Sequence, residues 1–365
     1  MAFLPLSLEV LLEESERQLM SRAASTPLVV GTKGSSLDLV MNTLYFDDEV
    51  PEFMTMEDVD WVEQTGLALP IPVYARFNAR GYPLIGTTLD YFDFRDLRIE
   101  AGRGLAIVGE AVIGAGVAER LNLKPGDFLL SSPENPFDLA GVYPLKMNVV
   151  GVLAKSHTSD DLAVFVDLKT AWIIEGLGHG HQDLVKTKDA SVLLNRTDNK
   201  VTANAKLKLY TEISEVNLDS FHFHGDPSQF QITAVIAVPH DEKSGILLQG
   251  RYVSQETNAQ IVKPDQVIDG LLQNIFQIKQ VIDGILVLVG IATLLAIILV
   301  FALSLRLRKR EVDTVFKLGG RRMMIARLLT AEIFLIIGMS AVLCVGMMAV
   351  VDVYKHDLVR MAIIR

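Results

Sequence analysis

The chain has 365 residues, 50% of them hydrophobic, and a formal net charge of −10 at pH 7. Its basic residues gather in segment 306–327, which holds eight Arg or Lys against two acids, so the remainder of the chain is strongly acidic. This distribution argues against nucleic acid as a partner, because a phosphate-binding surface needs clustered Lys and Arg. The single cysteine, Cys344, excludes a disulfide framework and a thiolate metal site.

Residues 1–25 are expected to form a helix that ends before Pro27, because the residue preceding a proline is pushed out of the helical region. The apolar run at its start contains Pro5 and Glu9 and is too short for a spanning helix. It also lacks the basic region and cleavage site of a signal peptide. Two interpretations stay open. The run is either the outer end of a membrane helix that begins before this chain, which we favour, or a helix lying at the membrane interface.

Residues 26–265 show the mixed patterns of an α+β domain. Short apolar or β-branched runs predict strands, and apolar-faced stretches of helical period predict helices. The predicted strands are 71–76, 84–88, 147–154, 162–166, 190–194 and 230–238, and the predicted helices are 37–44, 110–121 and 169–175. A short strand is expected to end at Gly31, and Pro125-Gly126 predicts a turn that leads into a further strand.

Two long apolar runs follow this domain. Residues 284–303 carry no charge, and a helix of this length covers the roughly 30 Å hydrocarbon core of a bilayer. Residues 333–351 form a second run that is also long enough to span. We predict a stalk and membrane helix over 266–305, with the helical pattern continuous from near Pro264, a second membrane helix over 328–352 and a C-terminal tail over 353–365.

The basic segment 306–327 lies between the two predicted spans. Short positive loops stay in the cytoplasm, so the domain at 26–265 is expected on the outer side of the membrane. A short amphipathic stretch followed by Gly319-Gly320 predicts a helix held along the membrane and then a sharp turn. The residues alone leave open whether this segment only sets the topology or also contacts a partner.

The segment resembles the coupling region of the FtsX/MacB/LolC class of ABC transporter permeases. The residues that fall on the pattern of that class are Arg310, Glu311, Lys317, Leu318, Gly319, Arg322, Ile325 and Glu332, with Gly320 where the class often has Ala. Residues 108–132 and 147–172 are similar to the periplasmic core domain of MacB-type permeases. That second match is carried by Gly126, Asp127, Val150, Gly151, Asp161, Val164, Phe165 and Val166. The class has four spans, whereas this chain shows two and the fragment at 1–25.

The resemblance implies a permease subunit that couples ATP hydrolysis by a separate cytoplasmic ATPase to motion of its extracytoplasmic domain. This mechanotransmission would drive export or extraction of a substrate. The implied contact with the ATPase comprises Arg310, Glu311, Lys317, Leu318, Gly319, Gly320, Arg322 and Glu332. The resemblance also implies a second permease copy, a possible periplasmic partner and a place in the lipid bilayer of the bacterial inner membrane.

The chain itself is expected to be no enzyme and to bind no cofactor, with ATP and Mg²⁺ held by the ATPase. It contains neither a P-loop nor a Gly-x-Ser-x-Gly elbow. Acid pairs such as Asp160-Asp161 are interpreted as turn residues rather than a catalytic dyad. The alternative function is a membrane-anchored sensor or scaffold whose domain binds a ligand or a metal without any ATPase.

Two His-x-His pairs are candidate metal ligands, namely His179 with His181 and His222 with His224. On a strand, side chains two residues apart share a face, so each pair can present two imidazoles to one zinc ion. Asp183 and Asp226 are close enough in sequence to assist. The preferred interpretation is nevertheless that these are solvated loop histidines, because glycines flank both pairs.

Overall fold

The computed structural model describes residues 3–132, 144–180, 193–197, 200–203, 211–213, 218, 221–254, 258–310, 314, 317 and 322–363. The chain divides into two compact units. We call residues 20–268 the sheet domain, and residues 1–19 together with 269–363 the helical unit.

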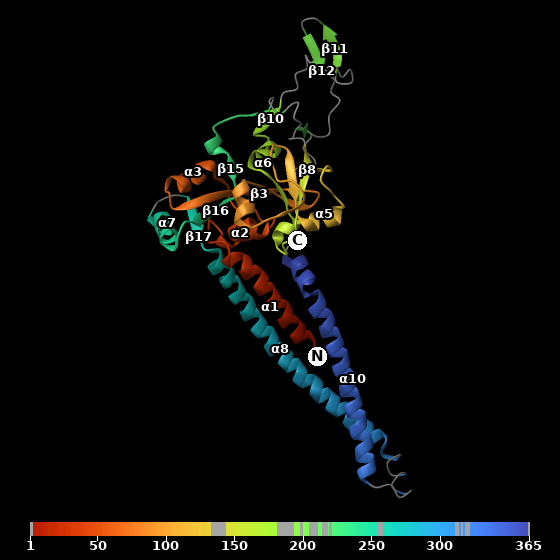
Figure 1. Cartoon of the computed structure of the whole chain (residues 1–365). Coiled ribbons are helices and arrows are strands. Elements are labelled where there is room, and N and C mark those ends of the chain that lie inside the picture. Colours follow the sequence, from red (N-terminus) through yellow and green to blue (C-terminus); the bar gives the residue numbers. More distant parts are fainter. Residues whose placement is uncertain are drawn as a thin grey trace. The chain divides into compact units, whose positions relative to one another are not determined.

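The sheet domain is built on one large mixed sheet (Figure 1). Across this sheet the strands follow the order β13 (Thr211–Glu212), β8 (Leu145–Leu153), β6 (Glu110–Ile113), β9 (Val164–Asp167), β4 (Tyr82–Thr87), β3 (Ala68–Ala79), β16 (Ala234–Pro239), β1 (Leu28–Thr32) and β17 (Ala259–Val262). Two further strands, β5 (Ile99–Gly102) and β7 (Phe128–Leu130), also pair with β8. The pairs β4–β9, β6–β8 and β8–β13 are parallel, and the other pairs are antiparallel.

Alternate side chains of a strand point to opposite faces of a sheet, so one strand can contribute to the core on both sides. In this sheet both faces carry a cluster of buried apolar side chains. On β3, Ile71 and Val73 belong to one apolar cluster while Tyr74 belongs to the other. The hairpin between β3 and β4 closes with Arg80 and Gly81, whose φ angles of 51° and 82° match the tight turn that favours strand twist.

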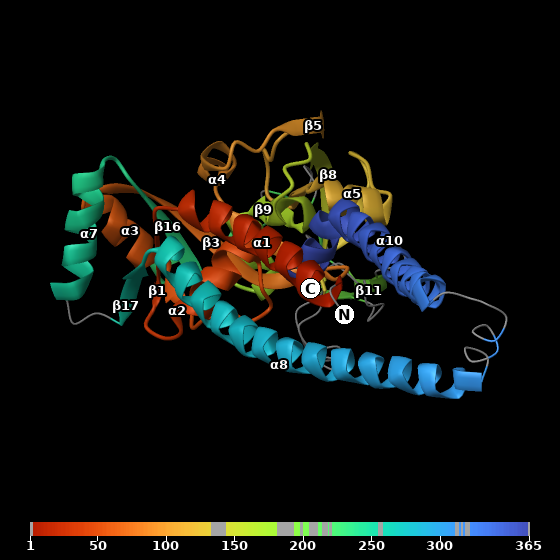
Figure 2. The ribbon, with the colours of Figure 1, turned by 90° about the horizontal axis from the view of Figure 1, so that it is seen from below.

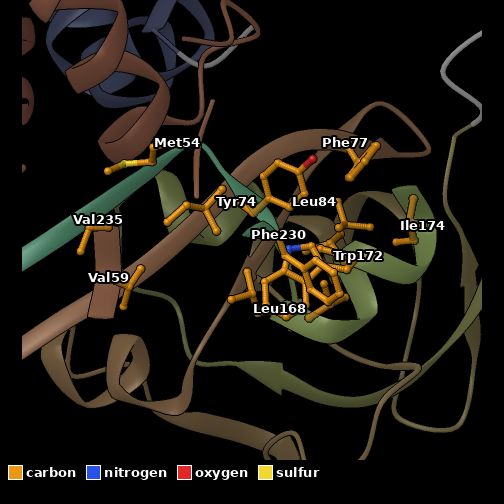
Figure 3. Close-up of a cluster of buried hydrophobic side chains, with 14 of the residues drawn as sticks. Met54, Val59, Tyr74, Phe77, Leu84, Leu168, Trp172, Ile174, Phe230 and Val235 are labelled. Atoms are coloured by element: carbon orange, nitrogen blue, oxygen red, sulfur yellow. The ribbon is translucent and has the colours of Figure 1, made fainter. Parts of the chain in front are cut away.

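Helices cover each face of the sheet. The cluster around Tyr74 receives Val59 from α3 (Met56–Gln64), Trp172 from α6 (Leu168–Glu175) and Leu248 from α7 (Glu242–Ser254). Figure 3 shows Tyr74, Trp172 and Phe230 converging in this cluster. The opposite cluster receives Tyr91 from α4 (Leu89–Phe94) and Phe46 from the end of the π-helix η1 (Met41–Tyr45), which continues α2 (Ser36–Val40).

Most strand predictions are confirmed: β3 contains the predicted run 71–76, and β4 and β8 end within one residue of the predicted runs 84–88 and 147–154. The predicted strand 230–238 is divided between β15 (Gln231–Ile232), which pairs with β2 (Met54–Thr55), and β16. The prediction of one helix over 110–121 was wrong in its first half. Residues Glu110–Ile113 form β6, and only Ala115–Leu121 form a helix, α5. The reason is tertiary: β6 is fully buried and pairs with β8 on one side and β9 on the other, which overrides local helical preference.

Three smaller differences concern boundaries. The predicted strand 162–166 begins only at Val164, because Leu162 closes the short 3₁₀-helix η2 (Ser159–Leu162). The predicted helix 37–44 is divided between α2 and η1. The predicted strand 190–194 lies mostly outside the described residues, and β11 (Leu193–Thr197) begins near its end and pairs with β12 (Lys200–Ala203).

The helical unit contains most of α1 (Phe3–Ala24) and α8 (Pro264–Leu307) and all of α10 (Arg322–Ile363). Among the described residues, Pro264–Leu307 and Thr330–Lys355 are long and apolar enough to cross a membrane, and their apolar windows are not buried. Helix α8 is one unbroken helix (Figure 2). Its 44 residues correspond to a length of about 66 Å, which exceeds a bilayer core of about 30 Å. The predicted boundary between span and tail at residue 352 falls inside α10, which runs on to Ile363.

Candidate functional site

The helices α1 and α8 enter the sheet domain through two neighbouring strands. Helix α1 ends at Ala24 and β1 begins at Leu28, while β17 ends at Val262 and α8 begins at Pro264. The two strands are antiparallel, with Val29 opposite Val262, so both helices leave from the same end of this strand pair. Proline suits the first turn of α8 because its missing N–H would have no partner there. Both helices are therefore joined to the sheet by very short links.

A buried polar cluster lies at the last turn of α1. The Arg22 guanidinium makes a bidentate contact with Asp160, with Nη1 2.6 Å from Oδ2 and Nη2 2.9 Å from Oδ1. Its Nη2 also donates to the Tyr91 hydroxyl at 2.9 Å, and its Nε donates to the main-chain oxygen of Leu44. The Tyr91 hydroxyl donates in turn to Asp160 Oδ1 at 2.9 Å. We call Arg22, Leu44, Tyr91 and Asp160 the α1 joint.

The joint is shut off from solvent. The side chain of Arg22 is 6% exposed and that of Asp160 2%. Burying two charges is costly unless the geometry is good and the remaining lone pairs are satisfied. Here Thr158 Oγ1 donates to Asp160 Oδ2 at 2.8 Å, and the guanidinium lies 5.4 Å from the centre of the Phe46 ring.

Asp160 is held in place by its own backbone as well. It belongs to η2, which runs directly into the buried strand β9. A Cβ added to Gly114 would lie only 2.2 Å from the Asp160 main-chain oxygen, so this close approach of η2 requires glycine. The neighbouring Asp161 accepts hydrogen bonds from the backbone N–H groups of Ser156 and His157 at 2.8 and 3.0 Å. Asp161 is thus the turn residue that the sequence predicts, whereas Asp160 is an ion-pair partner.

The charges of the cluster perturb one another. Burial alone would lower the pKa of Arg22 and raise that of Asp160, but their mutual attraction holds the pKa of Arg22 above and that of Asp160 below the ordinary values. Burial, then the Asp160 charge, raises the pKa of Tyr91 to about 12, so the phenol stays a hydrogen-bond donor. Burial and the Arg22 charge lower the pKa of Arg95, which donates to Thr26 Oγ1 at 2.8 Å.

The α1 joint was not predicted from the sequence. An arginine near a helix end is ordinary, and Arg22 and Asp160 are separated by 138 positions in the chain. No local pattern signals such a pair.

The structure describes only part of the predicted ATPase contact. Arg310 and Lys317 are exposed, and Arg322 is the first residue of α10. Glu332 on α10 lies 3.5 Å from Arg308 Nη1 just after the end of α8, an ion pair in which both side chains are about half exposed. Glu311, Leu318, Gly319 and Gly320 lie outside the described residues.

The structure brings together some of the predicted metal ligands. Strand β10 (Gly178–Gly180) pairs with β14 (Phe221–Phe223), and His179 stands opposite His222 in this antiparallel ladder. The rings of His222 and His224 are 4.7 Å apart. His181 and Asp183 lie outside the described residues, and Asp226 instead caps the 3₁₀-helix η4 (Pro227–Gln229) by accepting from Ser228 N. Within the part of the chain that the structure describes, no group of three or more His, Cys, Asp or Glu is placed to hold a metal ion.

The chain was compared with known proteins. Residues 12–208 match the family model of the MacB-like periplasmic core domain, and no curated protein matches the chain. Among solved structures, the periplasmic region of MacB from Actinobacillus actinomycetemcomitans is 12% identical, with a TM-score of 0.37, over 67% of this chain and 92% of that one. The extracellular domain of the ABC-type transporter YknZ from Gram-positive bacteria is 13% identical, with a TM-score of 0.35, over 64% of this chain and 98% of that one.

The family match covers more than half of the chain, from within α1 to beyond β12. It includes β1 and β3 to β9 of the large sheet and both charged partners of the α1 joint. The two apolar helices that follow are those expected of a membrane-embedded member. The chain therefore belongs to the MacB-like periplasmic core domain family of ABC transporter permeases.

Proposed function

We propose that this chain is the permease subunit of an ABC transporter in which ATP hydrolysis by a separate ATPase moves the sheet domain. The observation that carries the proposal is the continuity of α8. One residue, Lys263, separates this single helix from strand β17; the helix contains an apolar stretch and ends at Leu307, at the start of the basic segment. A displacement at its cytoplasmic end is therefore delivered to the sheet without an intervening flexible loop.

The basic segment is the proposed contact with the ATPase. Eight Arg or Lys residues lie in 306–327, and short positive loops remain in the cytoplasm, where ATP is bound. The proposed contact residues are Arg310, Glu311, Lys317, Leu318, Gly319, Gly320, Arg322 and Glu332. In this arrangement the chain spans the inner (plasma) membrane of a bacterium more than once, with the sheet domain outside.

In this proposal a substrate is moved by the sheet domain rather than through the helices. A second copy of the permease would form a dimer with this chain, and a periplasmic partner would receive or deliver the substrate. Both partners belong to the proposal.

Co-purification tests the ATPase contact. A tagged full-length chain, expressed from its native locus and extracted in mild detergent, is expected to retain an ABC ATPase. Glu311→Lys is expected to release that ATPase, because it reverses a charge in the proposed contact. The matched control is Glu242→Lys, the same change at an acidic residue in the first turn of α7 in the sheet domain. If no ATPase is retained by the unaltered chain, or if Glu311→Lys retains it fully, the proposal is wrong.

A zinc site in the sheet domain is a second candidate function, favoured by the position of His179 opposite His222 on the β10–β14 ladder. We propose His179, His181, His222 and His224 as its ligands, which would make the sheet domain a sensor or a zinc-dependent scaffold. Zinc bound to the full-length chain, measured by atomic absorption after dialysis, is expected to approach one ion per chain. The double variant His179→Ala, His181→Ala is expected to lose it, and the control His240→Ala is expected to keep it. No bound zinc at micromolar free metal would end this proposal.

A further inference from the structure

The covalent link between α1 and the sheet does not by itself transmit rotation of the helix to the sheet domain. Residues 25–27 join α1 to β1, and β1 lies next to the edge strand β17. A helix joined to a body through one short non-helical link can pull or push that body, but it can also swing about the link. Rotation of α1 is transmitted only if the helix is held to the domain at a second point.

The α1 joint supplies a second point of attachment. Through Asp160 it ties the last turn of α1 to η2 and hence to β9. In the sheet, β9 is separated from β1 by β4, β3 and β16, so the two attachments lie at well-separated places on one sheet. We propose that Arg22 is the positioning residue that makes α1 and the sheet domain turn as one body. This inference rests on the proposed mechanical function.

The chemistry of the joint suits this role. The hydrophobic effect is non-directional, whereas a bidentate guanidinium–carboxylate pair fixes the distance and the mutual orientation of its partners. Arg22 adds two more directed bonds, to Tyr91 on α4 and to the Leu44 oxygen of η1. The last turn of α1 is thereby fixed against three separate segments of the sheet domain.

Asp160, at the carboxylate end of the joint, is also held in a fixed position by the structure around it. Asp160 lies on η2 rather than on an exposed loop, and the main chain of η2 packs directly against Gly114. The backbone N–H of Gly114 donates to the oxygen of Ala163 at 2.9 Å, which ties the entry of α5 to the start of β9. A movement of Arg22 is thus passed to the centre of the sheet rather than absorbed by a side-chain or loop adjustment.

Stability alone does not require an ion pair at this place. Replacing a buried pair by apolar residues of similar size is often neutral or stabilising, while removing one partner leaves an unpaired buried charge. The double variant Arg22→Met, Asp160→Leu is therefore expected to stay folded but to lose the directed contacts. This double variant therefore distinguishes a role in positioning α1 from a role in packing the domain.

Pulsed electron paramagnetic resonance measures the joint directly. In a Cys344→Ala background, spin labels are placed at Ser21→Cys on α1 and at Lys155→Cys near η2, both at exposed positions. The full-length chain is measured in lipid nanodiscs, alone and, if the ATPase is retained, with ATP and trapping vanadate. We expect one narrow distance distribution, unchanged by nucleotide, when Arg22 and Asp160 are present.

In the double variant we expect the distribution to broaden at least about twofold and to shift with nucleotide, because α1 then moves without the domain. The matched control is Arg76→Met, Glu175→Leu. It removes a partly buried ion pair of 3.2 Å within the sheet domain that does not involve α1, and it is expected to leave the distribution narrow. Fluorescence of Trp61 and Trp172 reports whether each variant is folded.

A narrow, unchanged distribution in the folded double variant would overturn the proposal. Should that variant fail to fold, Arg22→Lys gives the same readout, because it keeps the charge and loses the bidentate geometry. Broadening then supports the proposal and an unchanged width overturns it. Absence of an ATPase in the purified chain counts against the proposed function alone, since the measurement without nucleotide still tests the joint.

Discussion

Individual residues decide how firmly the sheet domain is held at the α1 joint. Arg22 and Asp160 are both buried, and each makes the burial of the other tolerable. Gly114 allows η2 to approach, because the space that a side chain would need is filled by the main chain of Asp160 and Asp161. Two predictions concern these residues.

Asp160→Asn is expected to lower the free energy of unfolding by about 3–5 kcal/mol at pH 7, because Arg22 is left as an unpaired buried charge. The Arg22 charge holds the pKa of Asp160 below its ordinary value of 3.8. The unfolded chain therefore binds the proton first as pH falls. The stability from this carboxylate is present above about pH 4 and declines progressively as pH falls from there through the lowered pKa of the folded chain. The charged and titratable groups facing it, Arg22, Arg95 and Tyr91, keep their charge state in this range.

Denaturant unfolding of the full-length chain at pH 7 and at pH 3 checks this. Both tryptophans, Trp61 and Trp172, lie in the sheet domain, so their fluorescence reports its unfolding. The difference between the natural chain and Asp160→Asn should shrink at pH 3. A difference that is constant with pH would contradict the ion-pair account.

Gly114→Ala is expected to destabilise the sheet domain by about 1–3 kcal/mol, the usual cost of forcing extra atoms into a packed interior. The new Cβ would stand 2.2 Å from a backbone oxygen that cannot rotate away. Gly34→Ala is the matched control, since nothing lies within 4 Å of its added Cβ. Equal thermal midpoints for the two variants would show that η2 yields easily.

At the scale of elements, the connection between β17 and α8 is the central feature. Only Lys263 separates the strand from the helix, and β17 pairs along its length with β1, which follows α1. Helices and strands are stiff, so the flexibility of the connection depends on the number of residues outside them. We therefore expect this one-residue connection to be stiffer than the three-residue link between α1 and β1.

Insertion of three glycines after Lys263 is expected to loosen α8 from the sheet without unfolding the domain. Spin labels at Gln273→Cys on α8 and Lys155→Cys in the sheet domain, in the Cys344→Ala background, measure this. The distance distribution should broaden at least about twofold, because a Gly-rich linker behaves as a flexible coil. The same insertion after Gly104, in an exposed stretch of the sheet domain, serves as the control and should leave the distribution unchanged. A narrow distribution after both insertions would show that contacts other than the strand hold α8.

At the scale of the whole molecule, an acidic domain is followed by two apolar helices, and a basic segment lies between these two helices. The positive charge of that segment opposes its transfer across the membrane, and the polar sheet domain is unable to remain within it. The proposed topology follows from these two constraints.

Thiol labelling tests that topology. In a Cys344→Ala background, Lys169→Cys in the sheet domain is expected to react with a membrane-impermeant maleimide in intact spheroplasts. Lys309→Cys after α8 is expected to react only once the membrane is permeabilised. Both positions are exposed, so a difference in reactivity reports the side of the membrane rather than burial. The reverse pattern would invert the proposed orientation.

Much of the architecture follows from patterns that are local in the sequence. Short apolar or β-branched runs located β3, β4 and β8, and the uncharged run 284–303 located the apolar stretch of α8. Local patterns misled where long-range pairing decided the outcome, as at Glu110–Ile113, which is a strand because β8 and β9 flank it. The two histidine pairs were visible in the sequence as His-x-His. The placement of His179 opposite His222, however, depends on the antiparallel pairing of β10 with β14, two strands that are distant in the sequence.

The sequence by itself determined the two long apolar helices, the basic segment between them and the α+β class of the sheet domain, because charge, apolar length and periodicity act over neighbouring residues. Only the tertiary structure decided that Arg22 and Asp160 meet. Their attraction operates over a few ångströms inside a dry interior, and 138 positions of intervening chain must fold before it exists. The attachment of both α1 and α8 to one strand pair is likewise a property of the folded sheet.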